Sequence, residues 1–185
     1  MKKGRDNGSP RKSKIFLDKG RGKIALFLAF AALVVFLDQL TKLWIRENPA
    51  PMEVLPGFIN FLYSQNPGAV FGLPVNQTFL ITITVVVLIA IILLLLHYLP
   101  LTTTLTVISA GLIFGGAIGN LIDRLRFSGF VTDFIDMRIN NLFHWPWLFN
   151  FADAAIVIGT CILVYSVVQP KLFGKTRDYN RRIRN

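Results

Sequence analysis

The chain has 185 residues, of which 53% are hydrophobic and only 16% are charged, and its net charge at pH 7 is +10. This length fits one domain, and the composition is typical of an integral membrane protein rather than a water-soluble one. The basic residues gather at the two ends of the chain, where attraction to membrane lipids explains them better than binding to nucleic acid does.

Four apolar segments are long enough to cross a membrane as helices, since a hydrocarbon core of about 30 Å needs about 20 helical residues. They cover residues 24–45, 79–96, 101–122 and 149–168. We therefore predict one four-helix membrane domain over residues 24–169. The flanking segments 1–23 and 170–185 are predicted to be basic tails, the first of them disordered.

The distribution of basic residues predicts the orientation of these helices. Nine Lys and Arg residues precede Ile24 and six follow Val168. Because basic residues flanking membrane helices favour the cytoplasmic side, both termini are predicted to be cytoplasmic. The long connections 46–75 and 123–148 then lie outside. The first is predicted to form short strands, since FINFLYS at 58–64 is rich in aromatic and β-branched residues and a turn-forming NPG follows.

Five aspartates are expected to converge on the outer face. Asp38 and Asp123 lie near the outer ends of the first and third helices, and Asp153 lies at the outer start of the fourth. Asp133 and Asp136 lie in the connection between the last two helices, which we expect to be a loop. An ionisable group at membrane depth costs about 2.5 to 3.5 kcal/mol, so a chain that keeps several there is expected to use them.

Two sequence spacings place polar side chains on common helical faces. Asn120 and Asp123 are three residues apart, with Arg124 next to them, and the same spacing relates Asn150 to Asp153. Both spacings also have purely structural explanations. Asn150 and Asp153 could cap the fourth helix, and Arg124 could neutralise Asp123 at a helix end that disfavours acids.

Paired carboxylates at a membrane surface indicate acid-base chemistry. Two neighbouring carboxylates hold one proton between them, so that one activates water while the other protonates a carbonyl, as in an aspartic protease. Neither an HExxH nor a GxSxG motif occurs in the sequence, and we predict no metal or other cofactor. Two alternatives remain: a transporter, which also uses intramembrane acids, and a structural subunit. Spacing alone does not decide among Asp123, Asp133 and Asp136.

Five motifs are also similar in sequence and order to those of a known family. They are DQLTK at 38–42, NPGAVFG at 66–72, GGAIGNLIDR at 115–124, VTDFID at 131–136 and FNFADAAIVIG at 149–159. Over residues 24–168 the chain resembles the lipoprotein signal peptidases, the type II signal peptidases of bacteria. The resemblance implies an all-α integral membrane protein of four helices, with a small extracytoplasmic β-region on the outer face.

The resemblance also implies the activity and its residues. In the family, an aspartate dyad removes the signal peptide of a prolipoprotein by cutting just before a cysteine that carries diacylglycerol. The implied partners are therefore the lipid-modified prolipoprotein and the lipids of the bacterial cell membrane. The implied dyad is Asp133 and Asp153. The supporting or substrate-binding residues would be Asp38, Asn66, Gly68, Asn120, Asp123, Arg124 and Asn150.

Overall fold

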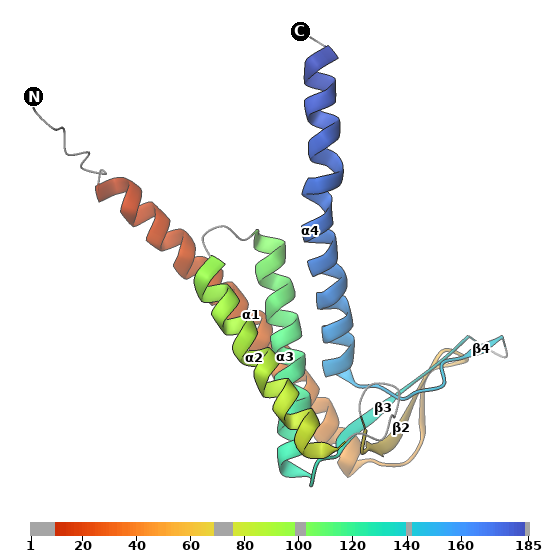
Figure 1. Ribbon diagram of the computed structural model, residues 1–185. Helices are drawn as coiled ribbons and strands as arrows, with labels where there is room; N and C mark the ends of the chain where they lie inside the picture. The colour runs from red at the N-terminus through yellow and green to blue at the C-terminus, as the bar shows by residue number, and fades with distance from the viewer. Residues whose placement is uncertain (1–9, 69–75, 99–102, 140–141, 184–185) are drawn as a thin grey trace, which may run out of the picture.

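Four long helices form the body of the protein. The computed structural model describes residues 10–68, 76–98, 103–139 and 142–183. Its helices are α1 (Pro10–Glu47), α2 (Gln77–Tyr98), α3 (Thr104–Arg126) and α4 (Phe151–Ile183), which run alongside one another (Figure 1). Each contains a stretch of membrane-spanning length and hydropathy, at Gly20–Glu47, Gln77–Tyr98, Thr104–Arg126 and Phe151–Val168. The prediction of four membrane helices is confirmed.

Helix α1 begins earlier than the first predicted span. Its backbone is helical from Pro10, although residues 1–23 are predicted to be a disordered tail. Extending an existing helix avoids the cost of nucleating a new one, which allows the long apolar segment to carry the helix into its basic flank. The boundaries at 23/24 and 169/170 remain predictions.

Helix α3 lies at the centre of the bundle because its glycines allow α1 and α4 to approach closely. A Cβ atom at Gly111 would lie 2.9 Å from the carbonyl oxygen of Phe27, and one at Gly115 would lie 2.7 Å from that of Ala31. Gly116 meets the backbone of Ala152 in α4 in the same way. Small residues at membrane helix interfaces typically have this function.

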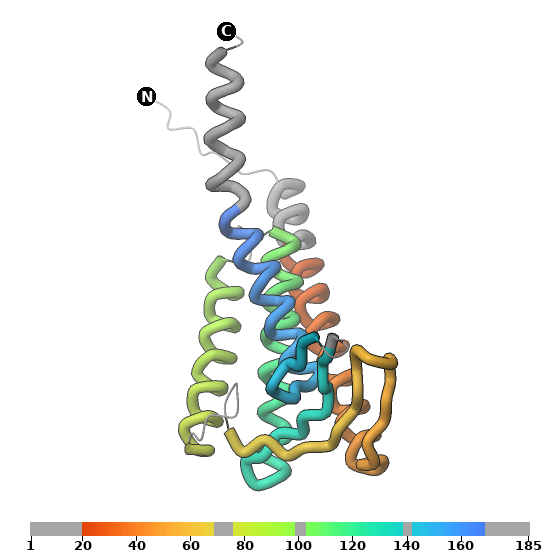
Figure 2. The backbone as a smooth tube through the Cα atoms, turned by 90° about the vertical axis from the view of Figure 1, so that its right-hand side faces the viewer, coloured from red at the N-terminus to blue at the C-terminus, as the bar shows by residue number. Residues whose placement is uncertain are grey.

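A four-stranded antiparallel sheet lies at one end of the bundle. Its strands are β1 (Met52–Leu55), β2 (Ile59–Asn66), β3 (Val131–Ile139) and β4 (Phe143–His144), in the order β1-β2-β3-β4. Figure 2 shows it beside the end of α1 and the start of α4. The predicted β-region is confirmed. The expectation of a loop around Asp133 and Asp136 is wrong, because both lie on β3, paired in register with Ser64 and Asn60 of β2.

An aromatic cluster attaches the sheet to the helices. Phe134 on β3 is fully buried, and its ring packs edge-on against Phe61 of β2 at a centroid distance of 5.2 Å and lies 6.3 Å from Phe151 of α4. Burying an aromatic side chain of this size contributes about 1.5 to 3 kcal/mol. The contact fixes β3 against the first turn of α4, which brings Asp133 close to the Asp153 turn.

Candidate active site

Asn150 links the buried carboxyl group of Asp133 to the half-buried carboxyl group of Asp153 where the sheet meets the helices. Asp133 is contributed by β3 and Asp153 by the first turn of α4. The Asn150 side-chain amide donates to Oδ1 of Asp133 at 2.7 Å, and its backbone N–H donates to Oδ2 of Asp153 at 3.2 Å. A single residue therefore positions both of the aspartates that the family resemblance nominates.

Asp133 has an environment suited to holding a proton near neutrality. Its residue is only 3% exposed, and its two oxygens accept hydrogen bonds from the side-chain amides of Asn66, at 2.8 Å, and Asn150. Burial, followed by the charge of Asp153, raises the pKa of Asp133 to about 7, against the opposing effects of the two amides and of Lys42. Desolvation and a neighbouring carboxylate both disfavour the charged form.

Asp153 is held by α3 and by the cap of its own helix. Asn120 in α3 donates from Nδ2 to Oδ1 of Asp153 at 2.8 Å. Asp153 in turn donates its backbone N–H to Oδ1 of Asn150 at 2.9 Å, which completes a reciprocal capping box at the start of α4. The capping and functional explanations of Asn150 and Asp153 are therefore compatible, since the cap also orients both carboxylates.

Three other predicted residues shape the loop that follows β2. The Oδ1 atom of Asn66 accepts a hydrogen bond from the backbone N–H of Gly68 at 2.8 Å, which turns the NH2 group of Asn66 toward Asp133. Arg124, at the end of α3, donates to the carbonyls of Gly68 at 2.9 Å and Gly129 at 3.0 Å. These contacts fix the segment beside Asp133.

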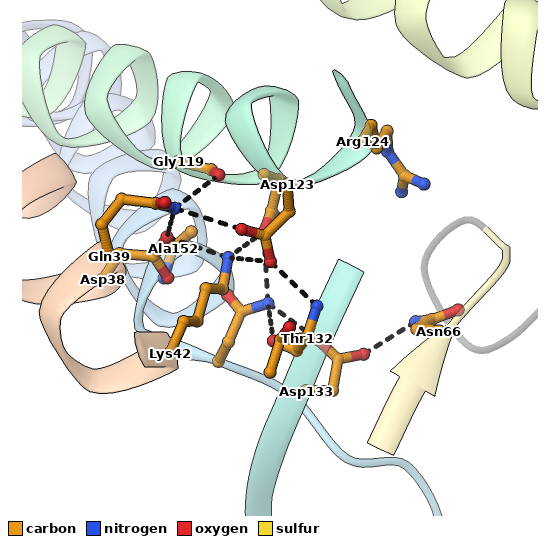
Figure 3. A network of polar contacts seen from close by, with 12 residues as sticks. Asp38, Gln39, Lys42, Asn66, Gly119, Asp123, Arg124, Thr132, Asp133 and Ala152 are labelled. Atoms are coloured by element: carbon orange, nitrogen blue, oxygen red, sulfur yellow. Dashed lines mark hydrogen bonds and ion pairs between the residues drawn. The ribbon is translucent and has the colours of Figure 1, made fainter. Parts of the chain in front are cut away.

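A buried ionic cluster lies close to Asp133, and Figure 3 shows Asp38, Lys42 and Asp123 within it. The fully buried ammonium of Lys42 lies 2.8 Å from Asp38 and 3.5 Å from Asp123, and Arg46 lies 2.8 Å from Asp123. Asp123 also accepts the backbone N–H of Thr132 at 2.9 Å. The structural alternative in which Arg124 neutralises Asp123 is therefore not what the structure shows, since the ion pairs of Asp123 are with Lys42 and Arg46 of α1.

The cluster also connects α1 to α4 and α3. Asp38 accepts the backbone N–H of Ala152 at 3.0 Å, and a Cβ atom at Gly119 would lie 2.6 Å from Oδ2 of Asp38. Sequence reasoning missed Lys42 and Arg46 as parts of the site. The four-residue spacing from Asp38 to Lys42 and on to Arg46 is the signal that could have found them.

Asp136 is engaged in a separate cluster on the sheet. Its buried carboxylate accepts from Asn60 at 3.1 Å and lies 2.7 Å from both Arg138 and His144. Burial works to raise the pKa of Asp136, but the hydrogen bonds from Asn60, His144 and Arg138 outweigh it and hold that pKa below its usual value. Asp136 thus stays ionised and joins β2, β3 and β4.

The described ranges contain no group of three or more His, Cys, Asp or Glu side chains placed to hold a metal ion. That the activity requires no metal or other cofactor stays a prediction. The polar atoms of the site belong mainly to amides, carboxylates and buried cations. Such an arrangement suits proton transfer between carboxyl groups.

A family model described as "Signal peptidase (SPase) II" matches residues 30–169. The chain belongs to the signal peptidase II family. It is 49% identical over 147 residues to the lipoprotein signal peptidase of Moorella thermoacetica, covering 78% of this chain and 93% of that protein. It is 41% identical over 161 residues to the lipoprotein signal peptidase of Syntrophus aciditrophicus, covering 79% and 94%.

Solved structures agree with this membership of the signal peptidase II family. Two structures described as bacterial membrane enzymes, determined by the in meso method at 2.3 and 1.9 Å, match with TM-scores of 0.69 and 0.66. Their sequences are 31% and 32% identical, over 80% and 78% of this chain and 90% and 93% of those chains. The chain is therefore a membrane-embedded aspartic signal peptidase, and the transporter and structural-subunit alternatives are set aside.

Proposed function

We propose that Asp133 and Asp153 are the catalytic dyad that cleaves prolipoproteins just before a diacylglyceryl-modified cysteine. The observation that carries this assignment is the sharing of Asn150 between the two carboxyl groups, of which that of Asp133 is buried and has a pKa raised to about 7. The substrate follows from the lipoprotein signal peptidases to which the chain is similar. Asp123 and Asp136 lack this arrangement because each is neutralised by cations.

We assign a different role to each aspartate of the pair. Asp133 holds the proton of the pair, and ionised Asp153 removes a proton from the attacking water. The water oxygen bonds to the scissile carbonyl carbon while Asp133 protonates the carbonyl oxygen. Asp153 then delivers its proton to the amide nitrogen, the C–N bond breaks, and Asp133 regains a proton from the collapsing diol. The pair returns to its starting state.

The amides and Arg124 complete the proposed site. Asn120 and Asn150 orient the dyad through the hydrogen bonds described above. Asn66 and Gly68 lie on the Asp133 side, on a segment that Arg124 holds in place. We assign this segment to contact with the substrate backbone next to the scissile bond.

Cleavage of a lipid-modified proprotein tests this function directly. The full-length chain, purified in detergent, should release the signal peptide at the bond before the modified cysteine, and exhaustive chelation should leave the rate unchanged. The same precursor without its diacylglycerol should be a much poorer substrate. Reversible loss of turnover on chelation, with recovery on adding back one metal, would contradict the carboxylate mechanism.

The dyad predicts a pH dependence with a defined sign. Because the pKa of Asp133 is raised to about 7, this residue keeps its proton up to neutrality and loses it as the pH rises further. Two ionised carboxylates have no proton for the carbonyl oxygen, so kcat/KM should fall above about pH 7. Initial rates on a lipidated precursor across neutral and alkaline pH measure this limb, and a flat alkaline profile would contradict it.

We further propose that both termini face the cytoplasm of a bacterial cell and that the sheet and dyad lie at the outer face of its membrane. In a Cys161→Ala background, a cysteine replacing Leu142, which is 87% exposed on the sheet side, should react with a membrane-impermeant maleimide in intact cells. A cysteine replacing Asn185 should react only after permeabilisation. The reverse labelling pattern would invert the topology.

A further inference from the structure

The Lys42 side chain is fully buried, and its ammonium group contacts three acceptor oxygens. Its Nζ atom lies 2.8 Å from Oδ2 of Asp38, 3.5 Å from Oδ2 of Asp123 and 3.0 Å from Oδ1 of Asn120. An ammonium group has three donors, and these three oxygens account for all of them. The contact with Asn120 connects this cation to the dyad.

The side-chain amide of Asn120 has one oxygen and one NH2 group, and the two are used differently. Its Oδ1 accepts from Lys42 and, at 3.1 Å, from Asn150. Its Nδ2 donates to Oδ1 of Asp153 at 2.8 Å. Because Lys42 can only donate, it fixes the amide with oxygen toward itself and NH2 toward Asp153. Rotating the amide by half a turn would place its oxygen against the Asp153 carboxylate.

We propose that Lys42 is a positioning residue for catalysis, which acts through Asn120 to orient Asp153 as the group that activates water. This inference rests on the dyad proposed above and extends it to α1. Lys42 touches neither dyad aspartate in the contacts described, so its effect passes through the polarised amide of Asn120 and through its charge. The charged groups facing it are Asp38 from its own helix, Asp123 from α3, and the dyad from β3 and α4.

A purely structural role for Lys42 makes a different prediction. If Lys42 only neutralised Asp38 and Asp123, its removal would lower the yield of folded protein but leave the chemistry of the surviving molecules intact. A positioning role requires a loss of kcat in folded protein. It also requires a pH profile displaced toward higher pH, since removing a cation favours the protonated forms of the dyad.

The test compares Lys42→Met with Arg21→Met in the full-length enzyme, purified in detergent and assayed on a lipidated precursor. For Lys42→Met we expect kcat to fall about 10- to 100-fold, as expected for a misplaced catalytic group, with a smaller change in KM. Both limbs of the pH profile should move to higher pH. Arg21→Met removes a cation from an exposed position of the same helix, outside the ionic cluster, so it should keep the wild-type kcat and pH profile.

Two further variants keep the test decisive where Lys42→Met folds poorly. In Lys42→Met with Asp38→Asn, the buried charge is balanced, so folding should recover while kcat stays reduced. In an Asn120→Ala background, adding Lys42→Met should cause a smaller further loss of kcat than it does in wild type.

Recovery of kcat together with folding in the charge-balanced variant would overturn the proposal, as would strictly additive losses of kcat. A wild-type pH profile in Lys42→Met would overturn it too. Each of these results leaves the dyad itself intact. Failure of the dyad is recognised separately, by turnover that survives Asp133→Asn or Asp153→Asn.

Discussion

Asp133→Asn and Asp153→Asn are each expected to reduce turnover by at least about 10³-fold, while binding of the lipidated precursor is retained. An amide preserves the shape of the carboxyl group and can keep one of the two hydrogen bonds that each carboxyl accepts, but it neither takes a proton from water nor gives one to a carbonyl oxygen. The measurement is kcat on correctly folded, detergent-purified enzyme, with binding followed separately by competition with uncleaved precursor.

The double variant and a matched control define how the loss should be interpreted. Because the two aspartates act as a unit, Asp133→Asn with Asp153→Asn should be little worse than either single change. Asp136→Asn is the matched control, because it also removes a buried carboxylate from β3. That carboxylate is bound to Asn60, Arg138 and His144 of the sheet, so this variant should retain most of its turnover. Turnover that survives Asp133→Asn would refute the assignment.

Asp123→Asn is expected to act on stability instead, lowering the free energy of unfolding by about 3 to 5 kcal/mol. The change leaves the buried ammonium of Lys42 and the guanidinium of Arg46 without the carboxylate they share. Removing one partner of a buried ion pair leaves the other charge unpaired in a poorly solvated environment. Thermal unfolding in detergent and the yield of monodisperse protein measure the loss.

Turnover per folded Asp123→Asn molecule should stay well above that of Asp133→Asn. Glu47→Gln is the matched control, because it removes a carboxylate from the exposed end of α1 and should leave the unfolding temperature nearly unchanged. An Asp123→Asn enzyme that is as stable as wild type but inactive would move the chemical role to Asp123.

The membrane helices could be predicted from the sequence because the signal for them is local. An apolar run of spanning length, such as residues 79–96, is sufficient to predict a membrane helix without information from the rest of the chain. Strand β3 was missed for the opposite reason. Its pairing partner β2 lies more than sixty residues earlier in the chain, and no pattern within 131–139 alone shows that such a partner exists.

The dyad was only partly predictable. Sequence spacing identified the acids but left Asp123, Asp133 and Asp136 as alternatives, and the family resemblance was needed to choose among them. What distinguishes these residues physically is whether a cation lies beside the carboxylate, as at Asp123 and Asp136, or a second carboxylate does, as at Asp133. That difference depends on contacts among α1, α3, α4 and the sheet, which sequence spacing does not encode.

The proposed dyad is divided between β3 and α4, which has a consequence for the order in which its parts are synthesised. Asp153 belongs to α4, which leaves the ribosome after α1, α2 and α3, and Asp133 is positioned by β2, which is synthesised before α2 and α3. A nascent chain with three helices inserted therefore contains one half of its acid-base pair. We therefore expect proteolytic activity only after α4 has entered the membrane, so a chain that lacks α4 should not cleave neighbouring proteins.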